Sequence, residues 1–182
     1  YYGRWLLDKS VVARVGDSIL LHGGLHPTTS LDDLSELDEK ARKEIKTYYE
    51  YRERLVEAGL ILPFFTFQET ITAVQQELDY WGELVAPTGP PAPDRSVSLG
   101  RDDRKLVNML LEMGDMDSWS VVDTDQVGPM WFRGFARWEE DEGLPQARTL
   151  TERYGVTRII VGHSIPASRL ITSRFGGRVF LI

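Results

Sequence analysis

Two of the chain's three histidines stand in the same kind of place, directly after an apolar run and beside glycine. His22 follows the run Ile19–Leu21 and precedes a Gly-Gly pair, and His163 follows Ile159–Gly162. Short apolar runs of this kind predict strands, and in α/β folds the carboxyl ends of strands present side chains to a ligand crevice. Neutral imidazole binds manganese, iron and zinc well. The pattern therefore favours a metal site at which both histidines meet; the alternative is that each is a hydrogen-bonded core or turn histidine.

Three segments, taken in order along the chain, extend this pattern. They are a His-Gly-Gly segment at 19–27, a Gly-Pro-Met-Trp-Phe-Arg-Gly segment at 128–134, and a Gly-His-Ser segment at 159–164 that precedes Arg-Phe-Gly-Gly-Arg-Val at 174–179. Together they resemble segments of the calcineurin-like metallophosphoesterase superfamily, in particular its phosphoprotein phosphatase group. The residues of these segments are most similar to those of the bacterial Shewanella-like phosphatases.

The resemblance implies a role for three residues. His22 and His163 would each supply an imidazole ligand to a dinuclear centre of manganese, iron or zinc, and Arg133 would hold phosphate oxygens. Arginine suits this task because its planar guanidinium offers two parallel hydrogen bonds and stays cationic. The implied activity is hydrolysis of phosphate monoesters by a metal-bridging hydroxide. The implied partner is a phosphorylated substrate, either a small molecule or a protein bearing phosphoserine, phosphothreonine or phosphotyrosine.

A complete site in this superfamily also needs Asp-x-His, Gly-Asp-x-x-Asp and Asn-His motifs, and this chain has none of them. No aspartate stands two positions before a histidine, Gly114-Asp115 lacks the second aspartate in register, and Asn108, the only asparagine, precedes methionine. In relatives these motifs precede the His-Gly-Gly segment. We therefore expect residues 1–182 to be the carboxyl-terminal portion of a metallophosphoesterase domain, catalytic in the parent protein and inactive alone.

Two other readings stay open. The chain could be a degenerate phosphoesterase fold that binds a metal or a phosphorylated partner without turnover, which fits the missing motifs. It could also be a structural α/β domain in which the histidines only end strands. The retention of His22, Arg133 and His163 counts against the binding module, because loss of catalysis would not require all three to remain. Metal affinity separates the structural domain from the other readings, since a structural domain would not bind manganese or zinc.

The elements that would position these residues are predicted from periodicity and turn signals. Amphipathic or apolar patterns predict four helices, at Leu31–Leu55, Glu69–Leu84, Arg101–Met113 and Gln146–Tyr154. β-rich runs predict strands at Val11–Val15, Ser18–His22, Arg158–Val161, Leu170–Arg174 and Arg178–Ile182, with hairpins at both ends of the chain. The proline-rich stretch from Pro87 to Ser98 predicts a loop.

Periodicity alone gives a mixed fold, α/β or α+β. The resemblance adds that this is part of a four-layer α-β-β-α metallophosphatase sandwich in which residues 29–125 form a helical, cap-like insertion. Half of such a sandwich would be absent from the chain, so we expect an apolar sheet face to be left uncovered.

Composition limits the remaining classes. The chain has 182 residues, 42% of them hydrophobic, which is typical of one globular domain. The net charge is −7, from 28 acidic and 21 basic residues, and this disfavours nucleic acid and anionic membranes as general partners. Cysteine is absent, which excludes disulfides and thiol chemistry, and no apolar run approaches the ~20 residues of a membrane span. None of this determines the cellular compartment.

Overall fold

The computed structural model describes residues 5–29, 33–85, 100–116, 119 and 128–182, and these fall into two compact units. The first unit comprises residues 1–46 and 117–182, and the second comprises residues 47–116. Helix α2 (Leu34–Glu57) contributes its first half to the first unit and its second half to the second. Among the described helices none is both long and apolar enough to cross a membrane.

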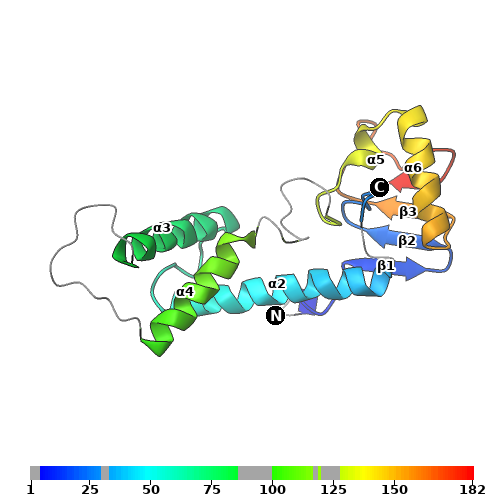
Figure 1. Ribbon diagram of the computed structural model, residues 1–182. Helices are drawn as coiled ribbons and strands as arrows, with labels where there is room; N and C mark the ends of the chain where they lie inside the picture. The colour runs from blue at the N-terminus through cyan, green and yellow to red at the C-terminus, as the bar shows by residue number, and fades with distance from the viewer. Residues whose placement is uncertain (1–4, 30–32, 86–99, 117–118, 120–127) are drawn as a thin grey trace. The chain divides into compact units, whose positions relative to one another are not determined.

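The first unit is built on a five-stranded mixed sheet in the order β1-β2-β3-β5-β4 (Figure 1). The three central strands, β2 (Ser18–Leu21), β3 (Arg158–Val161) and β5 (Val179–Leu181), are parallel. The outer strands β1 (Val12–Val15) and β4 (Thr172–Arg174) pair antiparallel with β2 and β5. The sheet and its helices confirm a mixed α/β class, and both predicted hairpins are present.

Alternation along the central strands places one set of side chains in the core. Two rows cross the sheet in register, Ile19–Ile159–Val179 and Leu21–Val161–Leu181, and all six residues are buried. They pack in one cluster with Ala147 and Leu150 of helix α6 (Glu140–Arg153), and with Phe135 of the short helix α5 (Gly134–Arg137). Burying each large aliphatic side chain contributes about 1.5–3 kcal/mol. This core fixes the carboxyl ends of β2 and β3 side by side.

The turn between β1 and β2 agrees with its sequence signal. Gly16 has φ +60°, which is the conformation that a two-residue hairpin of type II′ places on its first loop residue. The next residue, Asp17, ties this turn to the start of β3. Its carbonyl accepts the Thr157 N–H at 2.8 Å, and its carboxylate pairs with Arg158 at 3.1 Å.

Helix α6 is the clearest departure from the predicted elements. The sequence predicts a helix from Gln146, directly after Pro145, but the helix begins at Glu140 and carries Pro145 inside it. The acidic residues Glu140, Asp141 and Glu142 in its first turn suit the positive end of the helix dipole. Helix α5 was not predicted, because four residues are too few for a periodic pattern.

The second unit contains the second half of α2 together with α3 (Phe67–Val85) and α4 (Arg101–Gly114). Its buried apolar residues, among those that the structure describes, are Leu55, Ile61, Val74, Met109, Leu110, Met113 and Met116. Helix α3 begins after a capping box in which Glu69 accepts the Thr66 N–H at 2.7 Å while Thr66 Oγ1 accepts the Glu69 N–H at 3.3 Å. The predicted loop at Pro87–Ser98 lies outside the described residues, and the role of residues 29–125 as a cap stays a prediction.

Candidate active site

The parallel pairing of β2 and β3 brings His22 and His163 together. Leu21 is in register with Val161, so the residues after them leave the sheet at the same edge. The His22 carbonyl accepts two backbone N–H groups from the other strand end, Gly162 at 3.0 Å and His163 at 2.7 Å. His22 Nε2 and His163 Nδ1 are 2.6 Å apart, and the ring centroids are 4.6 Å apart at 77°. The structure thus joins two residues that are 141 positions apart in sequence.

Two imidazole nitrogens that face each other at this distance share one proton, so one ring donates and the other accepts. Neutral imidazole nitrogens are also metal ligands, so the two rings suit a cation in donor type, although they would have to separate from their present hydrogen-bonding distance to bind the same ion. His163 Nε2 is also buried and has no hydrogen-bond partner among the described residues. The donor set therefore fits a metal ion in kind but is incomplete: within the described ranges no group of three histidine, cysteine, aspartate or glutamate side chains is placed to hold one.

The electrostatic environment favours the neutral form of His163. Burial lowers its pKa below the ordinary value of 6.5, the nearby Arg133 guanidinium lowers it further, and His22 adds a smaller effect in the same direction. Neutral imidazole is the form that binds metals, because a protonated ring has no lone pair to offer. The effect of Arg133 on this pKa is electrostatic, so it requires the guanidinium to lie near the histidine pair.

The Gly-Gly pair after His22 explains how Arg133 reaches this place. Gly23 and Gly24 both donate their backbone N–H to the Pro129 carbonyl, at 2.8 and 3.2 Å. A Cβ on Gly23 would lie 2.7 Å from the carbonyl carbon of Met130, so a side chain cannot be accommodated there. Glycine beside a strand end can allow a ligand or metal to approach the backbone closely. The structure shows instead that these two glycines admit the chain's own segment 128–134.

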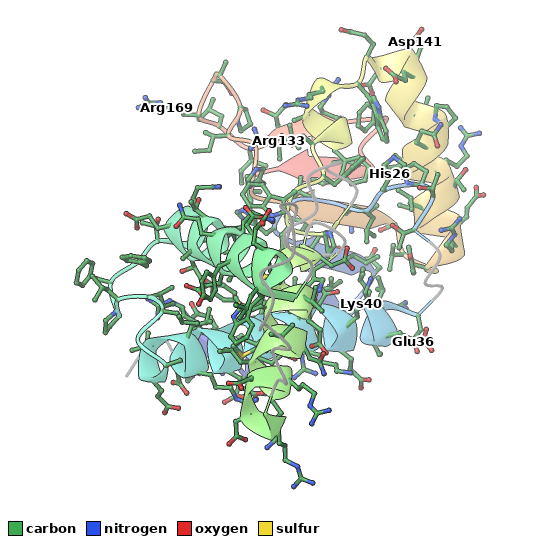
Figure 2. The ribbon with its side chains drawn as sticks, turned by 60° about the vertical axis from the view of Figure 1, so that its left-hand side comes forward. His26, Glu36, Lys40, Arg133, Asp141 and Arg169 are labelled. Carbon is green, nitrogen blue, oxygen red and sulfur yellow. The ribbon has the colours of Figure 1, made fainter. Side chains whose placement is uncertain are left out.

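Arg133 immediately precedes α5 and occupies its N-cap position. Its carbonyl accepts the N–H groups of Ala136 and Arg137, and its side chain is half-buried. The guanidinium has no hydrogen bond or ion pair with the residues that the structure describes. In the view of Figure 2, Arg133 lies between His26 and the loop that carries Arg169. Asp123 and Asp125 stand a few positions before Arg133 and could orient it or be solvated loop carboxylates; both lie outside the described residues.

Trp131 also lies at this site; the sequence singles it out only as one of several tryptophans near the predicted cap, where an aromatic side chain could line a pocket or pack in the core. Its ring is 5.5 Å from the ring of His163, and 40% of the residue is exposed. Trp131 stands two residues before Arg133, and this proximity is the only signal in the sequence that it belongs to the site. The signal is weak, because an aromatic residue in a short segment is equally compatible with packing in the core. The structure places the Trp131 ring edge-on against the ring of His163.

Two further residues near the site, Arg174 and His26, make hydrogen bonds elsewhere. Arg174 donates to three carbonyls at the end of α5. His26 accepts the Thr28 N–H at its Nδ1, 3.1 Å away, and its ring packs 5.3 Å from that of Phe132. The structure thus gives His26 a local role in the turn after the His-Gly-Gly segment.

Comparison with known proteins adds relatives of low similarity. No protein-family model matches the chain. An uncharacterized protein of Schizosaccharomyces pombe is 38% identical over 66 residues, which are 36% of this chain and 18% of that protein. The cold-active protein tyrosine phosphatase of a psychrophilic Shewanella covers 98% of this chain, with 16% identity and a TM-score of 0.45. A single-residue mutant of a cold-active protein tyrosine phosphatase gives 15% identity and a TM-score of 0.41.

The chain spans 35% of the length of each of these two solved phosphatases. Because the TM-scores are below 0.5 and the identities below 25%, the likeness does not decide the function or the metal content of this chain. Its chemistry has to be argued from the arrangement of His22, His163 and Arg133.

Proposed function

We propose that this chain is part of a metal-dependent phosphatase that hydrolyses phosphate monoesters, with His22 and His163 as metal ligands and Arg133 as the phosphate-binding residue. The observation that carries the proposal is the 2.6 Å approach of His22 Nε2 to His163 Nδ1 at the ends of two parallel strands. Gly23 and Gly24, directly after His22, donate backbone hydrogen bonds to the segment that bears Arg133. The four-layer sandwich and the cap role of residues 29–125 belong to this proposal.

Each residue has a distinct task in the proposed reaction. The lowered pKa of His163 keeps a ring lone pair available for a metal near neutral pH. The Arg133 guanidinium, which has no partner among the described side chains, is available to bind two phosphate oxygens and to stabilise the charge that develops on them during transfer. Two divalent ions, when bound, would supply a nucleophile at neutral pH and neutralise phosphate charge. The ligands that complete their coordination would come from residues beyond those described.

The test is a metal-dependent phosphatase assay on the protein expressed from the complete reading frame that encodes this chain. p-Nitrophenyl phosphate serves as substrate, with Mn²⁺, Zn²⁺ or Fe²⁺ restored after chelation. We expect hydrolysis that is lost with the chelator and regained with metal. His163→Ala and His22→Ala should each lower bound metal and reduce kcat by at least about 100-fold, while Arg133→Ala should retain metal and lose about 10²–10³-fold in kcat/KM.

His26→Ala is the matched control, because it removes a histidine of the same segment that is bonded to Thr28 instead of to the histidine pair. It should keep its metal and most of its activity. Metal bound without hydrolysis would favour the non-catalytic binding module. Absence of metal affinity in the complete protein would refute the proposal and favour a purely structural domain.

A further inference from the structure

Arg174, the last residue of β4, directs its guanidinium at the backbone of another element. Nη1 donates to the carbonyls of Phe135 and Ala136 at 2.9 and 3.0 Å, and Nη2 donates to the carbonyl of Trp138 at 2.5 Å. These carbonyls lie at the carboxyl end of α5, where a helix has no N–H groups of its own left to bond them. A cation at this end also complements the helix dipole. The Arg174 side chain therefore supplies hydrogen bonds to three backbone carbonyls at the end of this helix.

The guanidinium is itself held in place from several sides. It lies 4.6 Å from the ring of Phe175, its Nε is 4.0 Å from Glu140, and only 19% of the side chain is exposed. Glu140 also accepts the Gly176 N–H at 3.1 Å, which joins the hairpin turn to α6. Phe175 has φ +53° and is fully buried. A non-glycine residue keeps that conformation only where its surroundings determine it strongly, so Arg174 projects from a rigid turn.

The element that Arg174 holds is the one that carries Arg133. Helix α5 has four residues, far fewer than a helix needs to be stable on its own. Arg133 is its N-cap, and its carbonyl accepts the Ala136 N–H at 3.0 Å and the Arg137 N–H at 3.1 Å. The direction in which Arg133 leaves the backbone therefore depends on whether α5 is formed. Arg174 supplies bonds at the opposite end of that same helix.

We propose that Arg174 is a positioning residue: by capping the carboxyl end of α5, it orients Arg133 toward the phosphate site beside His163. This inference rests on the proposed function, because the task of Arg133 is phosphate binding. It also gives the hairpin β4–β5 a role in the site, although the turn of this hairpin, at Gly176 and Gly177, is exposed. Displacing an oxyanion-binding group by about 1 Å costs on the order of 100-fold in rate, so a loosened α5 should be measurable.

The experiment uses the complete protein loaded with Mn²⁺ and compares Arg174→Ala, Arg174→Lys and Arg178→Ala, each also in the Arg133→Ala background. Arg178 is the matched control, since it lies on the same hairpin and its side chain makes no described hydrogen bond or ion pair. Amide hydrogen exchange at 136–138 reports the formation of α5. Inhibition by inorganic phosphate, kcat and KM for p-nitrophenyl phosphate, and bound metal report the site.

We expect Arg174→Ala to speed exchange at 136–138 and to weaken phosphate inhibition by about 10-fold or more, with bound metal unchanged. Arg174→Lys should recover only part of this loss, because a lysine ammonium cannot span three carbonyls as a planar fork does. Added guanidinium ion should restore phosphate affinity in Arg174→Ala and have no such effect on Arg178→Ala. In the Arg133→Ala background, Arg174→Ala should cause no further loss, because its effect acts through Arg133.

Additive losses from the two substitutions would overturn the positioning role, as would unchanged exchange at 136–138. If Arg174→Ala lowers the amount of bound metal, or speeds amide exchange throughout the sheet, then Arg174 acts by stabilising the fold as a whole. Either result would also overturn the positioning role. A wild-type protein that binds metal but is not inhibited by phosphate would refute the proposed function of Arg133. In that case faster exchange at 136–138 in Arg174→Ala would still show that the cap exists, so the two failures can be told apart.

Discussion

At the scale of single residues, His163 combines two properties that belong together in a metal ligand. Its Nδ1 converges on another imidazole, and its environment disfavours the protonated ring. Both properties have the same origin, the position of the residue just beyond a buried strand. Burial places the ring beside low-dielectric surroundings, and the neighbouring guanidinium and imidazole oppose any added positive charge.

This environment gives the pH dependence of His163 a definite sign. We expect the ring in the folded chain to titrate below 6.5, its ordinary value, so that in this range the unfolded chain binds more protons than the folded one. The stability that comes from keeping His163 neutral is therefore present above pH 6.5 and is lost as the pH falls from 6.5 toward the pKa of the folded state. Arg133→Ala should raise the pKa of His163, since the guanidinium is the second largest cause of the shift.

Titration of the imidazole signals by NMR in the metal-free chain measures this pKa directly. Arg169→Ala is the control, because it removes the same charge from the loop after His163 without being a cause of the shift. A His163 pKa at or above 6.5 would contradict the described environment. A pKa that does not respond to Arg133→Ala would place the guanidinium too far away to serve the same site.

At the scale of elements, two helical glycines are predicted to respond in opposite directions to the same substitution. A Cβ on Gly143 of α6 would lie 2.1 Å from the ring of Phe175, which is fully buried and fixed in its turn. Gly143→Ala should therefore lower the free energy of unfolding by about 2–3 kcal/mol, as overpacking does in a rigid core. Gly82 of α3 has nothing within 4 Å of the added Cβ and is exposed. Gly82→Ala should stabilise the chain by about 0.5–1 kcal/mol.

Urea unfolding of the 182-residue chain, followed by circular dichroism, measures both changes. Hydrogen exchange in α6 and α3 assigns each change to its own unit. A neutral Gly143→Ala would show that Phe175 can move away, and it would then be a poor support for Arg174. A destabilising Gly82→Ala would indicate a contact that the open surroundings of this glycine do not show.

The elements also show where sequence reasoning succeeds and where it stops. The strands around Gly16 and Gly176 could be predicted because alternation and glycine turns are local signals, and His22 and His163 could be assigned to strand ends for the same reason. Helix α5 and the start of α6 before Pro145 could not be predicted. Arg174 bonds the end of α5, and the start of α6 contacts the β4–β5 hairpin through Glu140 and Gly143, so both depend on long-range contacts. The approach of segment 128–134 to Gly23 is a long-range contact, and no local signal in the sequence reveals it.

At the scale of the whole molecule, the face of the sheet opposite the core is apolar across its centre. Leu20, Ile160 and Phe180 stand in register on the three parallel strands and are only half-buried, and an apolar cavity of about 500 Å³ lies against Leu20 and His22. Strands that are buried on both faces read as continuous apolar runs, as these three do. A row of this kind in contact with water promotes association.

We therefore expect the 182-residue chain, expressed by itself, to self-associate through this row and to bind a hydrophobic dye. Phe180→Ser should shift the population toward monomer, because it breaks the row at β5. Ile165→Ser is the matched control: Ile165 is 75% exposed but lies in the loop after β3, so its loss should leave the association unchanged. Sedimentation velocity over a range of concentrations measures the monomer fraction, with circular dichroism to confirm that each variant is folded. If the wild-type chain stays monomeric at every concentration, or if both variants reduce association equally, the row is not the surface that drives it.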